Sequence, residues 1–160
     1  KFFIKYLKWP SNKINVENFF IEYGLQAINA KEYIHDFEIP NPKTKQFDFI
    51  AYKVSKRRYE DISTITGAFF CEKKLNKKFN VRFAYGGMAG IPKRSKSLEN
   101  LFNQKFESNF DEKSIETAIK NDFKPLTDCR ATSLYRHRVA ENLFKKFSCL
   151  VKNTFDIRET

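Results

Sequence analysis

The stretch "VRFAYGGMAGIPKRSKS", residues 81–97, runs from a strand-like apolar segment through two glycines into lysine and arginine. Gly86 and Gly87 fit neither the GxGxxG dinucleotide fingerprint nor the GxxxxGK[ST] phosphate-binding loop. Two glycines at a strand end are typical of positive φ or of close backbone approach. We therefore interpret the pair as the exit of a strand from a sheet.

Two segments ahead of this stretch alternate as strands do. They cover residues 47–58 and 62–73, and a lysine-rich turn over residues 73–80 leads into the quoted stretch. Together they predict a three-stranded antiparallel meander. One face of the first strand is expected to carry Phe47, Phe49, Ala51 and Lys53.

The N-terminal part of the chain predicts a smaller set of elements. Residues 1–9 and 30–40 are expected to form strands, with a short helical turn over residues 15–24 between them. Residues 40–46, which contain two prolines, are the best linker in the chain. We expect the first strand to lack support and to pair with a second copy, because unpaired sheet edges recruit neighbours.

Beyond Lys93 the apolar spacing becomes helical. Helices are expected over residues 95–104, 111–123 and 132–153, the first behind a serine cap and the second with acids in its first turn. Strands followed by helices predict an α+β fold. We expect an antiparallel sheet of three to four strands packed on about three helices.

Composition limits the classes of function. The chain has 160 residues, 41% of them hydrophobic and 18 of them Phe, which suits a single folded core and argues against disorder. No apolar run approaches the ~20 residues of a membrane span. Cys71, Cys129 and Cys149 are too far apart for a zinc or disulfide pattern and predict free thiols in a reducing cytoplasm. No motif marks catalytic or metal-ligating residues.

The formal net charge of +11 leaves an alternative open. Such a charge suits nucleic acid, an anionic cofactor or an acidic protein partner. The positive residues are scattered as well as clustered, and no aromatic stacking motif for RNA is present. A basic module that binds nucleic acid is therefore the alternative function, and salt-sensitive binding to random oligonucleotides would reveal it.

Four stretches in one order carry a resemblance. They are "FFIEYG" with "EYIHDFEIP" (19–40), "YKVSKRRYEDIS" (52–63), "AYGGMAGIPKRS" (84–95) and "DFKPLTDCRATSLYRHRVAENLF" (122–144). As a set they resemble the small, FAD-carrying subunit of bacterial xanthine dehydrogenases and, more broadly, the flavoproteins of molybdenum hydroxylases. The resemblance implies a fold like the CO dehydrogenase flavoprotein C-terminal domain over residues 47–157. Residues 1–46 would be a remnant of the FAD-binding domain.

The resemblance also implies a division of labour. The segments that hold iron–sulfur clusters and grip the FAD pyrophosphate would lie outside this chain, which looks like a fragment. A separate large subunit would carry molybdopterin, and electrons would pass through two-iron two-sulfur clusters and FAD to NAD in purine oxidation. The fragment alone is expected to be inactive, cytoplasmic, and without nucleic acid or membrane among its partners. A scaffold domain without flavin contact is a second alternative.

Two residues match flavin contacts in the resembling family. Ile34 matches an apolar residue that flanks the isoalloxazine, and Lys53 matches a lysine close to the flavin. A cation beside the ring favours the anionic reduced flavin and raises its potential. Glu32 is a weaker candidate on the same strand as Ile34. The turn and the last helix are expected to be oriented by a further set of charged residues: Arg57, Arg58, Asp61, Arg130 and Arg136.

Overall fold

The computed structural model describes residues 3–7, 12–39, 47–59, 61–73, 79–106 and 109–159. The chain divides into two compact units, Lys1–Lys45 and Gln46–Thr160, and each unit is described by itself. The expected linker over residues 40–46 lies outside the described residues, as do residues 74–78 of the expected turn.

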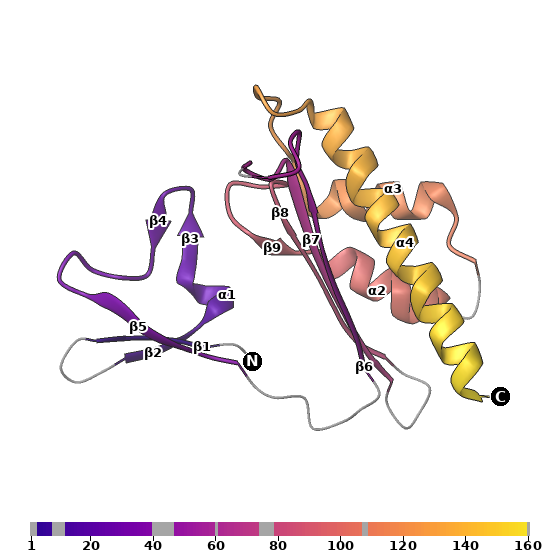
Figure 1. Ribbon diagram of the computed structural model, residues 1–160, viewed down its shortest axis with the longest axis horizontal. Coiled ribbons are helices and arrows are strands. Elements are labelled where there is room, and N and C mark those ends of the chain that lie inside the picture. The colour runs from indigo at the N-terminus through magenta and orange to yellow at the C-terminus, as the bar shows by residue number, and fades with distance from the viewer. Residues whose placement is uncertain are drawn as a thin grey trace. The chain divides into compact units, whose positions relative to one another are not determined.

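The N-terminal unit consists of short strands and one helical turn (Figure 1). A three-stranded antiparallel sheet has the order β2-β1-β5, and β3 pairs with β4 as a separate hairpin. The expectation that the first strand lacks support was wrong, because β1 pairs with a strand on each side. The elements are β1 (Phe3–Leu7), β2 (Asn12–Asn15), α1 (Val16–Phe19), β3 (Phe20–Glu22), β4 (Leu25–Gln26) and β5 (Tyr33–Glu38).

The C-terminal unit contains a four-stranded antiparallel sheet of order β6-β7-β8-β9. The first three strands form the expected meander. The fourth is the Lys93-Arg94 pair of the opening stretch, which pairs with Tyr85 and Ala84. The strands are β6 (Phe47–Val54), β7 (Ile65–Lys73), β8 (Phe79–Gly86) and β9 (Lys93–Arg94).

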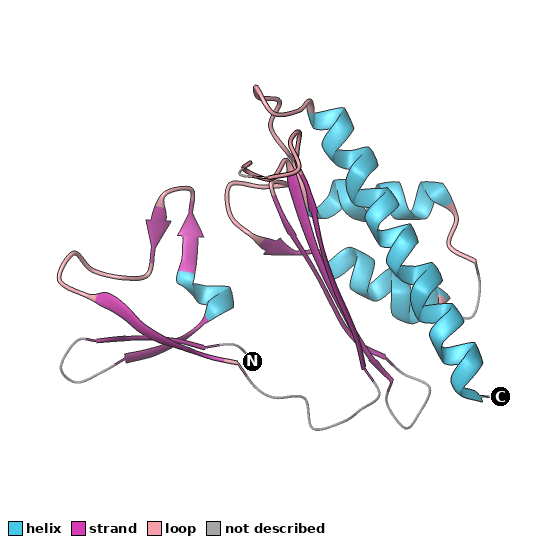
Figure 2. Ribbon diagram, in the orientation of Figure 1, coloured by secondary structure: helices cyan, strands magenta, loops and turns pink. Residues whose placement is uncertain are grey.

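Three helices cover one face of this sheet and leave the other open, as Figures 1 and 2 show. The Ser95 hydroxyl accepts a hydrogen bond from the backbone N–H of Leu98, and the Asp111 carboxylate accepts one from that of Ser114. Both side chains therefore act as N-caps. The helices are α2 (Lys96–Lys105), α3 (Glu112–Asp122) and α4 (Ser133–Glu159).

Aromatic side chains dominate the core between sheet and helices. Phe69, at the centre of β7, is fully buried, and its ring centroid lies 5.2 Å from that of Phe147 on α4 and 5.7 Å from that of Phe83 on β8. Burying one such side chain contributes roughly 1.5–3 kcal/mol. The core also contains Ile65, Cys71, Tyr85, Leu98, Phe102, Ile119, Phe123 and Phe144. The expected α+β class, with a small antiparallel sheet against three helices, is confirmed.

The two glycines of the opening stretch differ in their surroundings. Gly87 has a φ of +79°, and a Cβ placed there would lie 2.4 Å from the Thr64 carbonyl oxygen and 3.1 Å from Nη1 of Arg136. Gly86 ends β8, and a Cβ there would meet nothing closer than 3.7 Å. Gly87 therefore serves both the turn and a close approach.

Along the described residues, every helix is too short or too polar to traverse a lipid bilayer.

Candidate functional site

The open face of the four-stranded sheet carries Lys53. The strand register places Lys53 opposite Thr66, and Thr66 opposite Gly86. The neighbouring row consists of Ala51, Ala68 and Ala84, so the side chains beside Lys53 are small. Lys53 and Phe49 are exposed, as the alternation along β6 requires. The expectation that these residues share one face of the strand is confirmed.

The ammonium group of Lys53 has no hydrogen bond or ion pair with another described residue. The small side chains beside this cation leave room for a planar group to approach. The open face can therefore offer a positive charge to such a group, whereas the Thr66 hydroxyl already donates a hydrogen bond to Ser63 Oγ at 3.0 Å.

Ile34 lies on β5 in the N-terminal unit, where its backbone pairs with that of Tyr6. Its side chain is 39% exposed. Ile34 and Lys53 belong to different units, each described by itself. Glu32 precedes β5, and its Oε2 accepts hydrogen bonds from the backbone N–H and side-chain amide of Asn29 at 2.8 and 2.9 Å. Glu32 therefore closes a local turn, and its expected place on the Ile34 strand was wrong.

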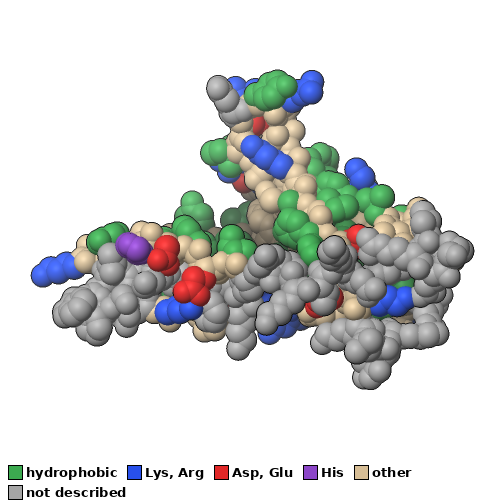
Figure 3. Space-filling view, turned by 60° about the horizontal axis from the view of Figure 1, so that its bottom comes forward, with side chains coloured by type: hydrophobic (Ala, Val, Ile, Leu, Met, Phe, Trp, Pro, Cys, Tyr) green, Lys and Arg blue, Asp and Glu red, His purple; other side chains and the backbone are tan. Residues whose placement is uncertain are grey.

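Large apolar side chains also reach the surface of the N-terminal unit. In the space-filling view, hydrophobic side chains stand beside acidic ones on part of this surface (Figure 3). Phe19 is the buried hydrophobic side chain of the described part of this unit. The exposed set is Ile21, Tyr23, Leu25, Tyr33, Phe37 and Ile39.

The turn after β6 is ordered by Asp61. Its Oδ2 accepts a hydrogen bond from the backbone N–H of Arg57 at 2.9 Å, and the guanidinium of Arg57 lies 3.8 Å from Oδ1. The backbone hydrogen bond from Arg57 is the main cause that lowers the pKa of Asp61. Arg58 lies over the ring of Tyr59, 5.3 Å from its centroid. Arg57 and Asp61 therefore orient the turn, as expected from the sequence.

Arg136, near the start of α4, joins three segments. Its Nη1 donates to the Thr64 carbonyl at 2.6 Å and to the Gly87 carbonyl at 2.8 Å, while its Nη2 donates to Asp128 Oδ1 at 2.7 Å. The side chain is only 5% exposed. The expected pairing of Arg136 with an acid is confirmed, and it seats α4 against the ends of the strands.

The Asp128 carboxylate also orders the loop before α4. It accepts hydrogen bonds from the backbone N–H groups of Arg130 and Ala131 at 2.9 and 3.1 Å. These bonds, together with Arg136, hold the pKa of Asp128 at about 2. The guanidinium of Arg130 lies 3.9 Å from the same carboxylate. Sequence reasoning did not find Thr64 or Gly87 as partners, because only the backbone carbonyls of these residues take part.

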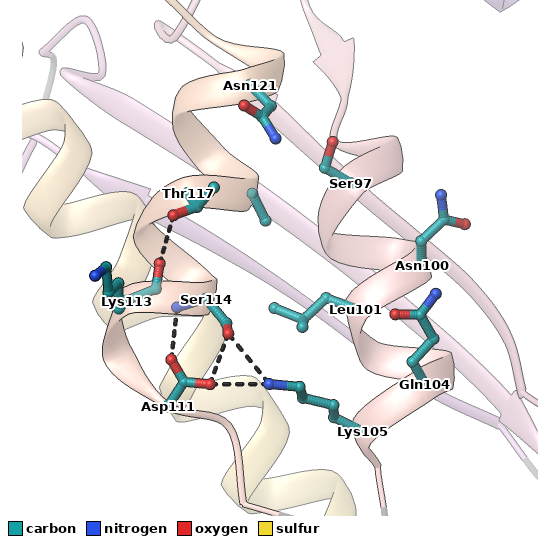
Figure 4. A pocket seen from close by; sticks show the side chains of 11 residues that line it. Ser97, Asn100, Leu101, Gln104, Lys105, Asp111, Lys113, Ser114, Thr117 and Asn121 are labelled. Atoms are coloured by element: carbon teal, nitrogen blue, oxygen red, sulfur yellow. Dashed lines mark hydrogen bonds and ion pairs between the residues drawn. The ribbon is translucent and has the colours of Figure 1, made fainter.

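A shallow groove of about 430 Å³ runs between α2 and α3 (Figure 4). At one end Lys105 Nζ donates to Asp111 Oδ2 at 2.9 Å and to the Ser114 hydroxyl at 3.2 Å. Leu101 and Ala118 add apolar surface to the lining. The hydrogen bonds from Ser114 and Lys105 lower the pKa of Asp111. This cluster caps α3, and its members already satisfy one another, so it offers no reactive group.

Within the described residues no group of three or more His, Cys, Asp or Glu side chains comes together as a metal site would require. The three cysteines are free thiols, and burial raises the pKa of the Cys71 thiol to about 12.

Several solved structures share this fold. One is the carbon monoxide dehydrogenase from Hydrogenophaga pseudoflava that lacks the Mo-pyranopterin moiety of the molybdenum cofactor, with a TM-score of 0.75 at 16% identity, covering 91% of this chain and 50% of that chain. Another is quinoline 2-oxidoreductase from Pseudomonas putida 86, with a TM-score of 0.73 at 14% identity, covering 96% and 53%. A third is reconstituted CO dehydrogenase from Oligotropha carboxidovorans, with a TM-score of 0.74 at 14% identity, covering 91% and 50%.

At these identities the likeness concerns the fold, and the chain spans about half the length of the solved chains that it matches. No curated protein matches it in sequence. The model of the CO dehydrogenase flavoprotein C-terminal domain family matches residues 50–149, which include β7, β8, β9, α2, α3 and the first part of α4. The chain therefore belongs to the CO dehydrogenase flavoprotein C-terminal domain family.

Proposed function

We propose that this chain is the C-terminal part of the FAD-carrying subunit of a molybdenum hydroxylase of the xanthine dehydrogenase type. The proposal rests on membership of the flavoprotein family and on Lys53, whose ammonium lies on the open face of the sheet and has no partner among the described residues. Residues 1–46 would complete the FAD-binding domain, and residues 47–157 would form the C-terminal domain that supports it.

The residues of this chain are compatible with one side of an isoalloxazine ring. Around Lys53 the open face carries little bulk, because Ala51 and Ala68 have only methyl groups and Gly86 has no side chain. Lys53 would supply positive charge at the ring, and Ile34, which is partly exposed, would supply an aliphatic contact. When bound, FAD would supply the electron transfer, with NAD as the proposed acceptor. The chain's own contribution is placement and charge.

The rest of the activity would belong to other parts of the assembly. Two-iron two-sulfur clusters and the FAD pyrophosphate site would lie in preceding segments of the same polypeptide, and molybdopterin in the large subunit. A reducing cytoplasmic location is compatible with three free thiols. By itself this chain is expected to oxidise no purine.

The test replaces Lys53 in the full natural flavoprotein, loaded with FAD. Lys53→Met is expected to lower the two-electron potential of the flavin by roughly 30–60 mV, because about 30 mV corresponds to 1.4 kcal/mol and an unscreened cation near the ring supplies one to two such steps. Lys113→Met, an exposed lysine on α3, serves as the matched control. Spectroelectrochemistry measures both potentials.

An unchanged potential in the Lys53→Met protein would support the scaffold alternative, in which this domain makes no contact with the flavin. Substrate identity is tested separately, by assaying the complete complex with xanthine, hypoxanthine and aldehydes. Turnover of aldehydes alone would reject the xanthine dehydrogenase type and leave the flavin contact untouched.

A further inference from the structure

A second pocket lies at the end of the four-stranded sheet, between the turn that follows β6 and the start of α4. Its volume of about 370 Å³ falls within the range of ~300–1,000 Å³ that is usual for small-molecule pockets. The flavin proposal does not use it, because Lys53 belongs to the open face of the sheet whereas Tyr135 and Thr132 approach from the helices. The lining consists of Ser55, Lys56, Thr64, Arg130, Ala131, Thr132 and Tyr135.

Two cations from separate segments meet at this pocket. Lys56 is held in place because its Nζ donates to the carbonyl of Cys129 at 2.7 Å, which links the turn after β6 to the loop before α4. Arg130 is held by its backbone, whose N–H donates to Asp128 Oδ1 at 2.9 Å. Both residues are exposed. The Arg130 guanidinium also lies 3.9 Å from the Asp128 carboxylate, but both side chains keep further N–H donors for a ligand.

The lining contains no carboxylate. The nearby carboxylate of Asp128 is already committed to the buried guanidinium of Arg136, and that of Asp61 to the turn at Arg57. Among the described residues, three cations at this end of the sheet, Lys56, Arg130 and Arg136, are therefore balanced by Asp128 alone. The remaining positive charge is available to an anion.

Neutral groups of the pocket suit an oxyanion as well. Thr132 Oγ1 accepts a hydrogen bond from the backbone N–H of Tyr135 at 3.2 Å, so the hydroxyl proton of Thr132 stays available. The pocket adjoins the first turn of α4, a helix of 27 residues whose N-terminal end carries the positive end of its dipole. The half-exposed ring of Tyr135 and the methyl group of Ala131 form apolar walls.

A buried donor lies next to this pocket. Nε of Arg136 is buried and has no hydrogen-bond partner among the described residues, although Nη1 and Nη2 of the same side chain are satisfied. Arg136 contacts Thr64, which lines the pocket, and lies one residue after Tyr135.

We propose that this pocket binds the phosphate group of a small-molecule ligand, with Lys56 and Arg130 as its charged contacts and Thr132 as a neutral donor. The site goes beyond the proposed flavin contact and does not depend on it.

The experiment titrates the 160-residue chain with sodium pyrophosphate at constant ionic strength and follows backbone amide resonances by NMR. We expect saturable shifts confined to the pocket segments, residues 55–57 and 128–136. In the Lys56→Met, Arg130→Met double variant the affinity is expected to fall at least about tenfold, because two charge-assisted contacts are lost. Thermal unfolding checks that each variant is folded.

The control is the Lys96→Met, Lys124→Met double variant, which removes the same charge from exposed positions outside the pocket. It is expected to bind pyrophosphate as the unmodified chain does. Equal weakening in both double variants, or shifts that spread over the surface without saturation, would overturn the proposal. Adenosine diphosphate and a single-stranded oligonucleotide form further arms. Binding of the oligonucleotide alone, with a steep salt dependence, would reject a small-molecule site in favour of a nucleic-acid backbone.

Discussion

At the scale of single residues, Arg136 and Gly87 together hold the start of α4 against the ends of β7 and β8. The guanidinium of Arg136 needs the Gly87 carbonyl and the Thr64 carbonyl at hydrogen-bond distance, and only a residue without Cβ lets the chain pass that close. Asp128 neutralises the buried charge. The glycine pair of the opening stretch thus serves the seating of the last helix.

Replacing Gly87 tests whether this close approach requires glycine. Gly87→Ala is expected to lower the free energy of unfolding by about 2–4 kcal/mol, because alanine is strained at positive φ and its Cβ would collide with a backbone carbonyl. The matched control, Gly86→Ala, is expected to change it by less than about 1 kcal/mol, since its Cβ meets only ordinary contacts. Urea denaturation measures both, and equal losses would contradict the assignment.

Acid should weaken the ion pair between Asp128 and Arg136. The pKa of Asp128 is lowered from 3.8 to about 2. A carboxyl group whose pKa is depressed by folding stabilises the native state above its unfolded pKa and loses that effect as the pH falls through the folded value. Asp128→Asn is therefore expected to lower Tm at pH 7, with a difference from the unmodified chain that shrinks as the pH approaches about 2. A difference that stays constant with pH would argue against an ionic role.

At the scale of elements, the two faces of β7 make different contacts. Side chains at odd positions, such as Phe69, pack under the helices, while Phe70 faces the open side and stacks on Phe47 with ring centroids 5.9 Å apart. The helices therefore rest on one set of alternate residues, and the other set is left for contacts outside this unit.

Two alanine variants compare the contribution of each face to stability. Phe69→Ala is expected to destabilise the C-terminal unit by about 3–5 kcal/mol, because it leaves a cavity among four aromatic rings. Phe70→Ala is expected to cost only about 1 kcal/mol, the worth of one ring pair at a partly exposed site. Chemical denaturation compares them, and a larger loss for Phe70 would mean that the core lies on the other face.

Most of the elements that the sequence predicts are long enough for a period to repeat. Strands β6 to β8 and helices α2 to α4 each span eight or more residues, so alternation or helical spacing is legible within them. Strand β9 has two residues and the β3–β4 hairpin five in its strands, so no period can develop. Pairing with strands elsewhere decides these short elements.

The candidate site was predictable to a similar extent. The face that Lys53 shares with Ala51 follows from alternation along one strand. The pocket between Lys56 and Arg130 does not, because the two residues are far apart in the chain and only the tertiary hydrogen bond from Lys56 to Cys129 brings their segments together. Local sequence patterns cannot predict such a long-range contact.

At the scale of the whole molecule, the two units differ in their means of stability. The buried cluster of the core lies entirely within residues 46–160, whereas Phe19 is the buried hydrophobic side chain in the described part of residues 1–45. A unit of about 40 residues rarely buries enough surface to fold alone. Stability should therefore reside in the C-terminal unit.

Expressing the units separately tests this difference. Residues 46–160 are expected to fold alone, with a cooperative thermal transition close to that of the whole chain. Residues 1–45 are expected to show little ordered structure in isolation, because their exposed apolar side chains require cover from elsewhere. Circular dichroism and amide dispersion in NMR spectra report both outcomes. A cooperative transition in the shorter piece would contradict this division.

The proposed flavin contact is tested most directly by a crystal structure of the proposed flavoprotein subunit with FAD bound. We expect the Lys53 ammonium within about 4–6 Å of the isoalloxazine, the range in which a charge shifts the ionisation of its neighbour. An isoalloxazine that lies away from the open face of the β6–β9 sheet, with Lys53 pointing into solvent, would contradict it.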